Sequence, residues 1–253
     1  MHSLLSKSIV ASLIGISMAA TPVTFLEEQL KFERVNSAYE EKEQTLKQTL
    51  GRHKISIDKL NLLIVACKDS DELDVYGKNT DDVSFKKILS YRVCARSGTL
   101  GPKSRRGDDQ VPEGFYYIDR FNPKSNFHLS LGLNYPNQAD KKRNGTTHDL
   151  GGDIFIHGAC VTIGCLPMTD YSIKEIYVLA AHARSNGQTK IPVYIFPFRM
   201  TKTNLRLYGN RYKSHEKLVD FWKNLAEGYD RFMQDYREVT FHAKADGSYE
   251  FDQ

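Results

Sequence analysis

The chain has an amphipathic helical pattern near each end. Between residues 25 and 50, apolar residues recur at loose helical spacing in a stretch rich in Glu, Lys and Gln, and Gly51 follows. This pattern predicts a helix that packs on the main domain or spaces that domain from a membrane. A stronger apolar stripe near the C-terminus predicts a second helix that needs a partner surface: Leu218, Phe221, Trp222, Leu225, Tyr229, Phe232, Met233 and Tyr236.

Short strand-like patterns dominate the region between these helices. Apolar, β-branched and alternating residues predict strands over 61–67, 72–76, 86–95, 115–119, 127–133, 154–156 and 191–198. Pro192 and Pro197 favour an edge or an end position for the last of these strands. Residues 138–152 are typical of a polar loop, and residues 239–251 can form a closing hairpin.

The first twenty residues are typical of a secretory signal peptide. Lys7 precedes a short apolar run over residues 9–18, and residues 17–20 resemble a signal-peptidase site. The run is too short to span a bilayer comfortably as a helix. An uncleaved anchor or a buried N-terminal helix are the alternatives. We therefore expect an exported protein of the periplasm or cell envelope.

These patterns divide the chain into four segments. They are a signal peptide (1–20), an N-terminal amphipathic helix (21–59), a main domain (60–200) and a C-terminal helical extension (201–253). Within the main domain, one helix is expected shortly after residue 168. Asp170 or Ser172 can cap its start, and Gly187 ends it.

Composition narrows the class of protein. With 40% hydrophobic and 26% charged residues, the 253-residue chain is typical of a folded globular protein. A formal charge of only +4, without a basic stripe or a known motif, argues against nucleic acid as a partner. The four cysteines allow three disulfide connectivities. A Cys67–Cys94 pair across a sheet, a Cys160–Cys165 pair, and buried free thiols all stay open.

The segment from residue 152 to 168 carries the candidate chemistry. His157 ends a short buried strand, and Cys165 follows eight residues later in a small-residue loop before the predicted helix. A thiol beside a neutral base is what nucleophilic acyl transfer requires, and Gly164 frees the backbone to aim N–H groups at an oxyanion. Spacing alone also allows two ordinary core residues, or a zinc site built from His148, His157, Cys160 and Cys165.

The full segment resembles the L,D-transpeptidase catalytic domain (YkuD-like) family. The family pattern is His-Gly, a short loop, then Ser or Thr, a residue, Gly and Cys, and it is filled here by His157-Gly158 and Thr162-Ile163-Gly164-Cys165. The stretches 112–118 and 126–137 look like the approach to the family's site, and the resemblance spans roughly residues 60–200. Ile163 and Pro167 replace a histidine and an arginine common in the family, as in its YafK-like branch.

The resemblance implies a fold and a mechanism. The fold would be mainly β or α+β, an L,D-transpeptidase-type β-sandwich with one helix after the catalytic cysteine and helical extensions at both ends. Cys165 would attack a diaminopimelate carbonyl of a peptidoglycan stem peptide, with His157 as base and the Gly158 carbonyl orienting the imidazole. Backbone N–H groups around Ile163, Gly164 and Cys165 would bind the oxyanion, and Asn134, Tyr135 and Thr162 would line the cleft.

The resemblance also implies partners and alternatives. No metal and no cofactor is expected, and the protein is expected to be a monomer that acts on stem peptides. A murein-linked outer-membrane protein is a further candidate partner. The alternative to transpeptidation is an amidase or hydrolase with the same thiol chemistry. A non-catalytic wall-binding or zinc-stabilised module is the alternative from another class.

Overall fold

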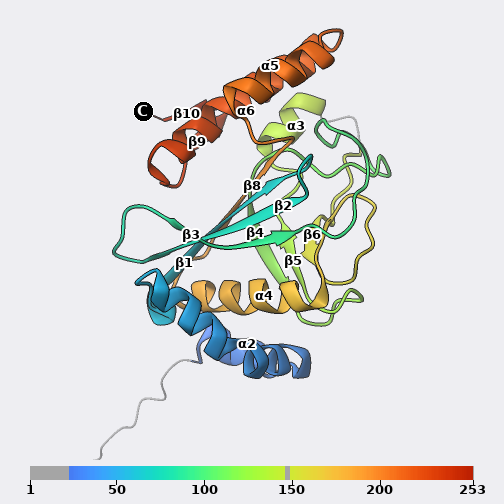
Figure 1. The fold of residues 1–253 in the computed structure, drawn as a ribbon. Coiled ribbons are helices and arrows are strands. Elements are labelled where there is room, and N and C mark those ends of the chain that lie inside the picture. Colours follow the sequence, from blue (N-terminus) through green and yellow to red (C-terminus); the bar gives the residue numbers. More distant parts are fainter. Residues whose placement is uncertain (1–22, 146–148, 253) are drawn as a thin grey trace, which may run out of the picture.

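The computed structural model describes residues 23–145 and 149–252, so the predicted signal peptide and His148 lie outside the described residues. One mixed sheet forms the centre, in the order β3-β2-β1-β8-β4-β5-β6-β7. The expected α+β class is confirmed, and its strands belong to a single curled sheet (Figure 1). The strands are β1 (Leu60–Cys67), β2 (Glu72–Asn79), β3 (Lys86–Arg92), β4 (Gly114–Asn122), β5 (Ser130–Leu133), β6 (Phe155–His157), β7 (Leu166–Pro167) and β8 (Ile191–Phe196).

Both faces of the sheet are covered, as β1 shows. Alternate residues of a strand point to opposite faces. Leu62, Ile64 and Ala66 pack in one buried cluster with the helix after β7, whereas Leu63, Val65 and Cys67 pack in another with the C-terminal helices. A strand buried on both faces is apolar throughout rather than alternating, which explains the continuous apolar run of β1.

The two prolines predicted an edge position for β8 in the sheet, or proline positions at the ends of the strand. Strand β8 lies inside the sheet, parallel to β1 and antiparallel to β4, so the edge position was wrong. The end position of its prolines was right. Pro192 precedes Val193, where pairing with β1 begins, and Pro197 follows the last strand residue. Proline lacks only its own N–H, and at these positions that loss leaves the ladder with β1 intact.

Three helices, two from the N-terminal residues and one that follows β7, cover one face of the sheet (Figure 1). Helix α4 (Asp170–Ser185) follows β7, and its cap is Thr169, whose side chain accepts from the Ser172 N–H at 3.2 Å. The expected caps, Asp170 and Ser172, were therefore wrong, because both already belong to the helix. The single helix expected over 25–50 is α1 (Phe25–Leu30) and α2 (Glu33–Arg52), which pack against α4. A short 3-10 turn, η1 (Ile57–Lys59), leads into β1.

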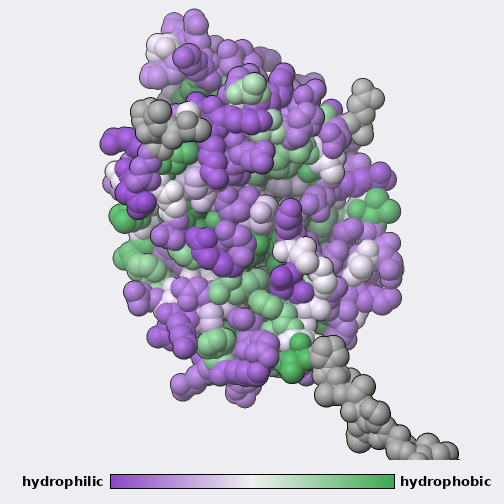
Figure 2. Space-filling model, turned by 180° about the vertical axis from the view of Figure 1, so that it is seen from behind, coloured by the Kyte–Doolittle hydropathy of each residue, from purple (hydrophilic) through white to green (hydrophobic). Residues whose placement is uncertain are grey.

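The C-terminal residues form a layer on the other face. Helix α5 (Lys202–Arg211) precedes α6 (Glu216–Asp235), and a small hairpin of β9 (Phe241–Ala243) and β10 (Tyr249–Phe251) closes the chain, as predicted. The apolar stripe of α6 packs on the sheet through Trp222, Leu225, Tyr229 and Phe232. None of the helices in the described part of the chain is long and apolar enough to span a bilayer, and the face in Figure 2 is largely hydrophilic with small apolar patches.

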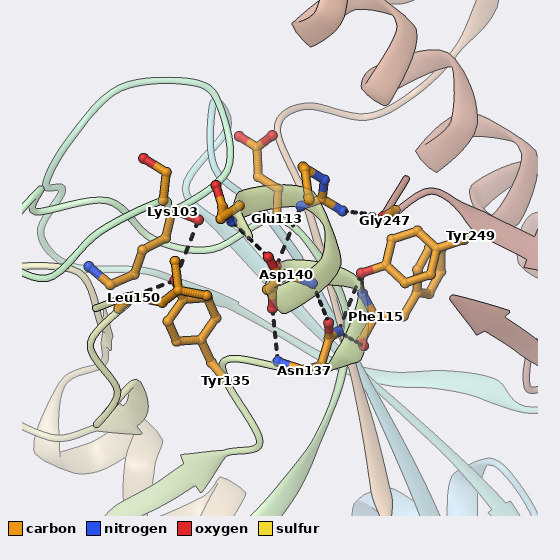
Figure 3. Close-up of polar contacts among 12 residues, drawn as sticks. Lys103, Glu113, Phe115, Tyr135, Asn137, Asp140, Leu150, Gly247 and Tyr249 are labelled. Atoms are coloured by element: carbon orange, nitrogen blue, oxygen red, sulfur yellow. Dashed lines mark hydrogen bonds and ion pairs between the residues drawn. The ribbon is translucent and has the colours of Figure 1, made fainter. Parts of the chain in front are cut away.

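One helix was missed by the sequence. Residues 138–144, expected as polar loop, form α3 (Gln138–Asn144), which begins with a capping box between Asn137 and Asp140. Asp140 is fully buried and receives hydrogen bonds from the Asn137 N–H at 3.0 Å and the Tyr116 hydroxyl at 3.2 Å. Arg143 adds a weaker contact at 3.4 Å (Figure 3).

The burial of Asp140 predicts a pH-dependent stability. Burial raises the pKa of this carboxyl from 3.8 to about 6. Between these values the folded chain keeps a proton that the unfolded chain loses, so stability falls as pH rises through that window, by at most about 3 kcal/mol. We expect Asp140→Asn to gain stability relative to wild type between about pH 4 and 6.5 in urea unfolding. A stability difference that stays constant across the window contradicts this expectation.

Candidate active site

Two short neighbouring strands bring His157 and Cys165 together. His157 ends β6, and Cys165 immediately precedes β7. The strands are parallel, with His157 opposite Pro167, so the loop over residues 158–165 is held at both ends. Both side chains line one pocket of about 480 Å³, together with Phe127, Ser130, Phe155, Thr162 and Ile163.

The imidazole of His157 is fixed as a neutral base. Its Nδ1 lies 2.6 Å from the Gly158 carbonyl oxygen, which accepts only from a protonated Nδ1. Nε2 is then the unprotonated nitrogen. His157 is buried, its ring lies 4.6 Å from that of Phe127, and burial lowers its pKa below the ordinary value. The backbone oxygen thus has the orienting position that a carboxylate has in other triads.

Gly158 is also required by space. A Cβ there would lie 2.6 Å from Asp170 Oδ1 and 2.8 Å from the Phe127 carbonyl oxygen. Asp170 accepts a hydrogen bond from the Ala159 N–H at 2.9 Å, which fixes the turn after His157. Sequence reasoning considered Asp170 only as a helix cap. The first turn of α4 therefore holds the carbonyl that orients the base.

The Cys165 thiol lies at the border of two pockets. It accepts a hydrogen bond from the Phe155 N–H at 3.4 Å and donates to the Asp153 carbonyl at 3.6 Å. Burial raises the pKa of the Cys165 thiol, so its resting form is the neutral thiol. Besides the pocket of His157, it borders a second pocket of about 250 Å³. Arg211 of α5 and Arg96 also line that second pocket.

Thr162 shapes the loop around Cys165. Its hydroxyl oxygen accepts from the N–H groups of Gly164 and Cys165 at 3.1 and 2.8 Å, and it donates to the Cys165 carbonyl at 2.9 Å. These two N–H groups, expected as oxyanion donors, therefore point at Thr162 in this structure. Ile163, which lies between Thr162 and Gly164 in the sequence, is 79% exposed. Thr162 must release the amides before they can bind an oxyanion.

Asn134 and Tyr135 do not line the pocket of Cys165, contrary to expectation. The Asn134 side-chain oxygen accepts from the Tyr117 N–H at 2.8 Å, and Asn134 lines a different groove. Tyr135 is buried, and its hydroxyl lies 3.2 Å from the Leu150 carbonyl oxygen (Figure 3). Both residues are held by packing and hydrogen bonds of the scaffold, which sequence resemblance alone does not reveal.

The cysteine pairing differs from both predicted pairs. Cys94 and Cys160 form a disulfide, while Cys67 and Cys165 are free thiols and Cys67 is buried. Cys160 lies in the loop between His157 and Cys165, so the bond ties this loop to the end of β3. It also removes Cys160 from the possible zinc ligands, and no group of three or more metal-binding side chains occurs within 23–145 and 149–252.

The disulfide predicts a redox-dependent stability. The bond closes a loop with a sequence separation of 66 residues, and we expect Cys94→Ser to lower the free energy of unfolding by about 2–4 kcal/mol. Thermal unfolding with and without a reductant measures the effect. The reductant should destabilise the wild type and leave Cys94→Ser unchanged. Equal loss in both proteins, or none in either, contradicts the prediction.

A free thiol and a neutral, oriented imidazole line one pocket on a curled α+β sheet, the arrangement expected of a cysteine nucleophile and its base. Residues 64–195 match the family model "L,D-transpeptidase catalytic domain". The chain is 38% identical over 176 residues to "Putative L,D-transpeptidase YafK" of Escherichia coli K12, covering 68% of this chain and 67% of the relative. This chain belongs to the L,D-transpeptidase catalytic domain family.

The similarity of this chain to solved structures is weaker. The cell shape determining protein Pgp2 from Campylobacter jejuni is 17% identical, with a TM-score of 0.43 over 73% of this chain and 74% of that one. Bd1075 of Bdellovibrio bacteriovorus is 24% identical, with a TM-score of 0.39 over 67% and 59%. At these scores the likeness adds nothing to the assignment, which rests on the family model and the E. coli relative.

Proposed function

We propose that this protein is a cysteine-dependent L,D-transpeptidase that acts on peptidoglycan stem peptides through a thioester on Cys165. The observation that carries the proposal is the pairing of the Cys165 thiol with the oriented, neutral imidazole of His157 in one pocket. Family membership supplies the substrate class. The same thioester serves an amidase or hydrolase if water resolves it, so product analysis separates the two activities.

The geometry supports general-base catalysis. Cys165 Sγ attacks the carbonyl carbon at the L-centre of a diaminopimelate residue, while the thiol proton passes to His157 Nε2. The carbon–nitrogen bond then breaks, the departing amine takes the proton from His157, and an acyl thioester remains. A second amine attacks the thioester and gives its proton to His157, which returns it to the leaving Cys165 sulfur.

The two pockets at Cys165 fit a reaction with two substrates. His157 lines only the larger pocket, whereas the smaller one contains Arg96 and Arg211. An acyl donor in one pocket and an amine acceptor in the other can meet at the thioester carbonyl on Cys165, since Cys165 lines both pockets. Incubation of the protein with purified murein, followed by separation of the fragments, tests this. New cross-links or attached chains support transpeptidation, and free shortened stems indicate hydrolysis.

The neutral resting state predicts the pH profile. His157 must be unprotonated to accept the thiol proton, and burial holds its pKa below the ordinary value of 6.5. We expect kcat/KM to rise with pH below that value and then stay level to about pH 8, since the thiol pKa is raised. A resting ion pair would lose activity as the imidazolium deprotonates. A fall in kcat/KM between about pH 6.5 and 8 would therefore contradict a neutral pair.

We also propose that the protein works outside the cytoplasm, in the periplasm or cell envelope, as a monomer. The Cys94–Cys160 disulfide supports the location outside the cytoplasm, because disulfides persist in oxidising compartments. The signal-like first twenty residues agree with it. Cell fractionation with sequencing of the mature N-terminus tests the location. A murein-linked outer-membrane protein is a candidate second substrate, to be sought among the products of the murein assay.

A further inference from the structure

A groove of about 550 Å³ lies apart from the pockets of Cys165. The chain segments of β4 and β8 line one side of it, and α3 and β9 line the other. The wall at β9 comes from the C-terminal residues, beyond the residues 64–195 that match the family model. The mechanism proposed for Cys165 and His157 uses none of the groove residues.

We propose that this groove binds the N-acetylhexosamine glycan of peptidoglycan while the stem peptide reaches Cys165. The identity of the polymer rests on the proposed function, because peptidoglycan joins the two moieties. The chemical class of ligand comes from the lining, which combines flat rings with polar groups. Sugars carry apolar C–H faces that stack on rings, and hydroxyl and acetamido groups that need hydrogen bonds.

Tyr117 supplies one of these rings. Its side chain is half-buried in the groove, and Lys190 Nζ lies 5.1 Å from the ring centroid. The ring of Pro192, directly opposite Tyr117 in the sheet, and the half-buried ring of Phe241 add apolar surface. A largely apolar groove with a few polar groups is typical of a small-molecule site.

Polar groups with unused hydrogen-bonding capacity surround these rings. Asn134 uses its side-chain oxygen on the Tyr117 N–H, and within the described residues its NH₂ group makes no hydrogen bond. The exposed amide of Gln138 and the ammonium of Lys141 lie along the α3 wall, likewise without a hydrogen-bonded partner in the described chain. Neutral amides and single ammonium groups suit hydroxyl and acetamido oxygens.

Hydrogen bonds connect the walls of the groove to one another. Asn137 donates to the Phe115 carbonyl at 3.0 Å and to the Tyr249 hydroxyl at 3.4 Å. Arg143 of α3 donates to the Gly247 carbonyl at 2.9 Å (Figure 3). These contacts join α3 to both β4 and the C-terminal hairpin. The groove is therefore largely formed before a ligand arrives, which lowers the entropic cost of binding.

Strand β4 links the groove to the active-site pocket. Tyr117 lines the groove, and Asn122 at the end of the same strand lines the pocket of His157 and Cys165. Five residues of strand span about 17 Å, a length that an extended peptide of about five residues covers. A glycan in the groove and a stem peptide at Cys165 can thus belong to one ligand.

The test is a titration of Cys165→Ala protein with a β-1,4-linked tetramer of N-acetylglucosamine, which has no peptide to react. We expect saturable binding, weakened about tenfold by Tyr117→Ala and also weakened by Gln138→Ala. The matched control is Tyr171→Ala, since Tyr171 is 59% exposed and also lies beneath a lysine, Lys42. Thermal unfolding verifies that each variant is folded, and the exposed Gln138 remains informative if Tyr117→Ala is not.

Two results would overturn the glycan site. One is absence of tetramer binding, and the other is binding that Tyr117→Ala and Gln138→Ala leave unchanged. Neither result bears on Cys165, whose acylation by a small acyl donor is measured separately on the protein with its thiol intact. With that thiol, Tyr117→Ala should raise KM for intact murein and leave the reaction of a glycan-free stem peptide unchanged. Equal effects on both substrates would also count against the groove.

Discussion

Cys165→Ala is expected to abolish turnover of murein, with a loss of roughly 10⁴-fold or more in kcat. The sulfur of Cys165 is the only free thiol in the pocket of His157 among the described residues. Without it no thioester forms, and the bound stem peptide has no nucleophile on the protein. Chromatography of murein fragments over time measures the loss.

Cys67→Ala is the matched control for this loss. Cys67 is the other free cysteine, and burial raises the pKa of its thiol to about 12, so it stays protonated and inert. It packs among residues of the sheet and the C-terminal helices. Cys67 also borders the smaller pocket of Cys165, but it is only 6% exposed, so Cys67→Ala should keep most of the activity, although it should lower stability. Full activity of a folded Cys165→Ala protein would remove Cys165 from the mechanism.

His157→Gln should lower the rate of Cys165 acylation by about 10²–10⁴-fold, the usual contribution of a general base. The pKa of the thiol is raised by burial, so few molecules hold a thiolate without help. Glutamine is similar in size but accepts no proton near neutral pH. The remaining activity should increase with pH as the thiol itself ionises, unlike the level profile of the wild type. A stopped assay over several pH values measures both effects.

His53→Gln serves as the control for His157→Gln. His53 is the C-cap residue of α2, where its backbone N–H donates to carbonyls of the last turn. It is distant in sequence from the site. This variant should leave both the rate and the pH profile unchanged. Should His157→Gln keep the wild-type rate at neutral pH, a different group must accept the thiol proton.

The candidate catalytic pair could be found in the sequence because its signal is local. His157, Gly158 and Cys165 lie within nine residues, and a strand, a loop and a helix surround them in sequence order. All strands of the large sheet except β7 were predicted for the same reason, since each apolar run carries its own pattern. The two faces of the sheet could not be separated from β1 alone, because both faces are apolar.

The disulfide was not predicted because it depends on a contact between residues that are distant in the sequence. Cys94 and Cys160 pair across 66 residues, and the fold alone decides which cysteine meets which. Thr162 lines the pocket of Cys165 as expected, but the sequence did not predict that its hydroxyl binds the backbone of its own loop. Helix α3 was missed because its residues are polar, although the Asn137 and Asp140 capping box was readable in the sequence.

The most direct measurement of the central claim is the mass of the Cys165 peptide after acylation. The protein is incubated with a stem tetrapeptide or a carbapenem, digested, and analysed by mass spectrometry. The proposed mechanism predicts an adduct on Cys165 that hydroxylamine removes, that is absent from Cys165→Ala, and that forms more slowly in His157→Gln. Murein turnover by a protein whose Cys165 never carries an acyl group would contradict it.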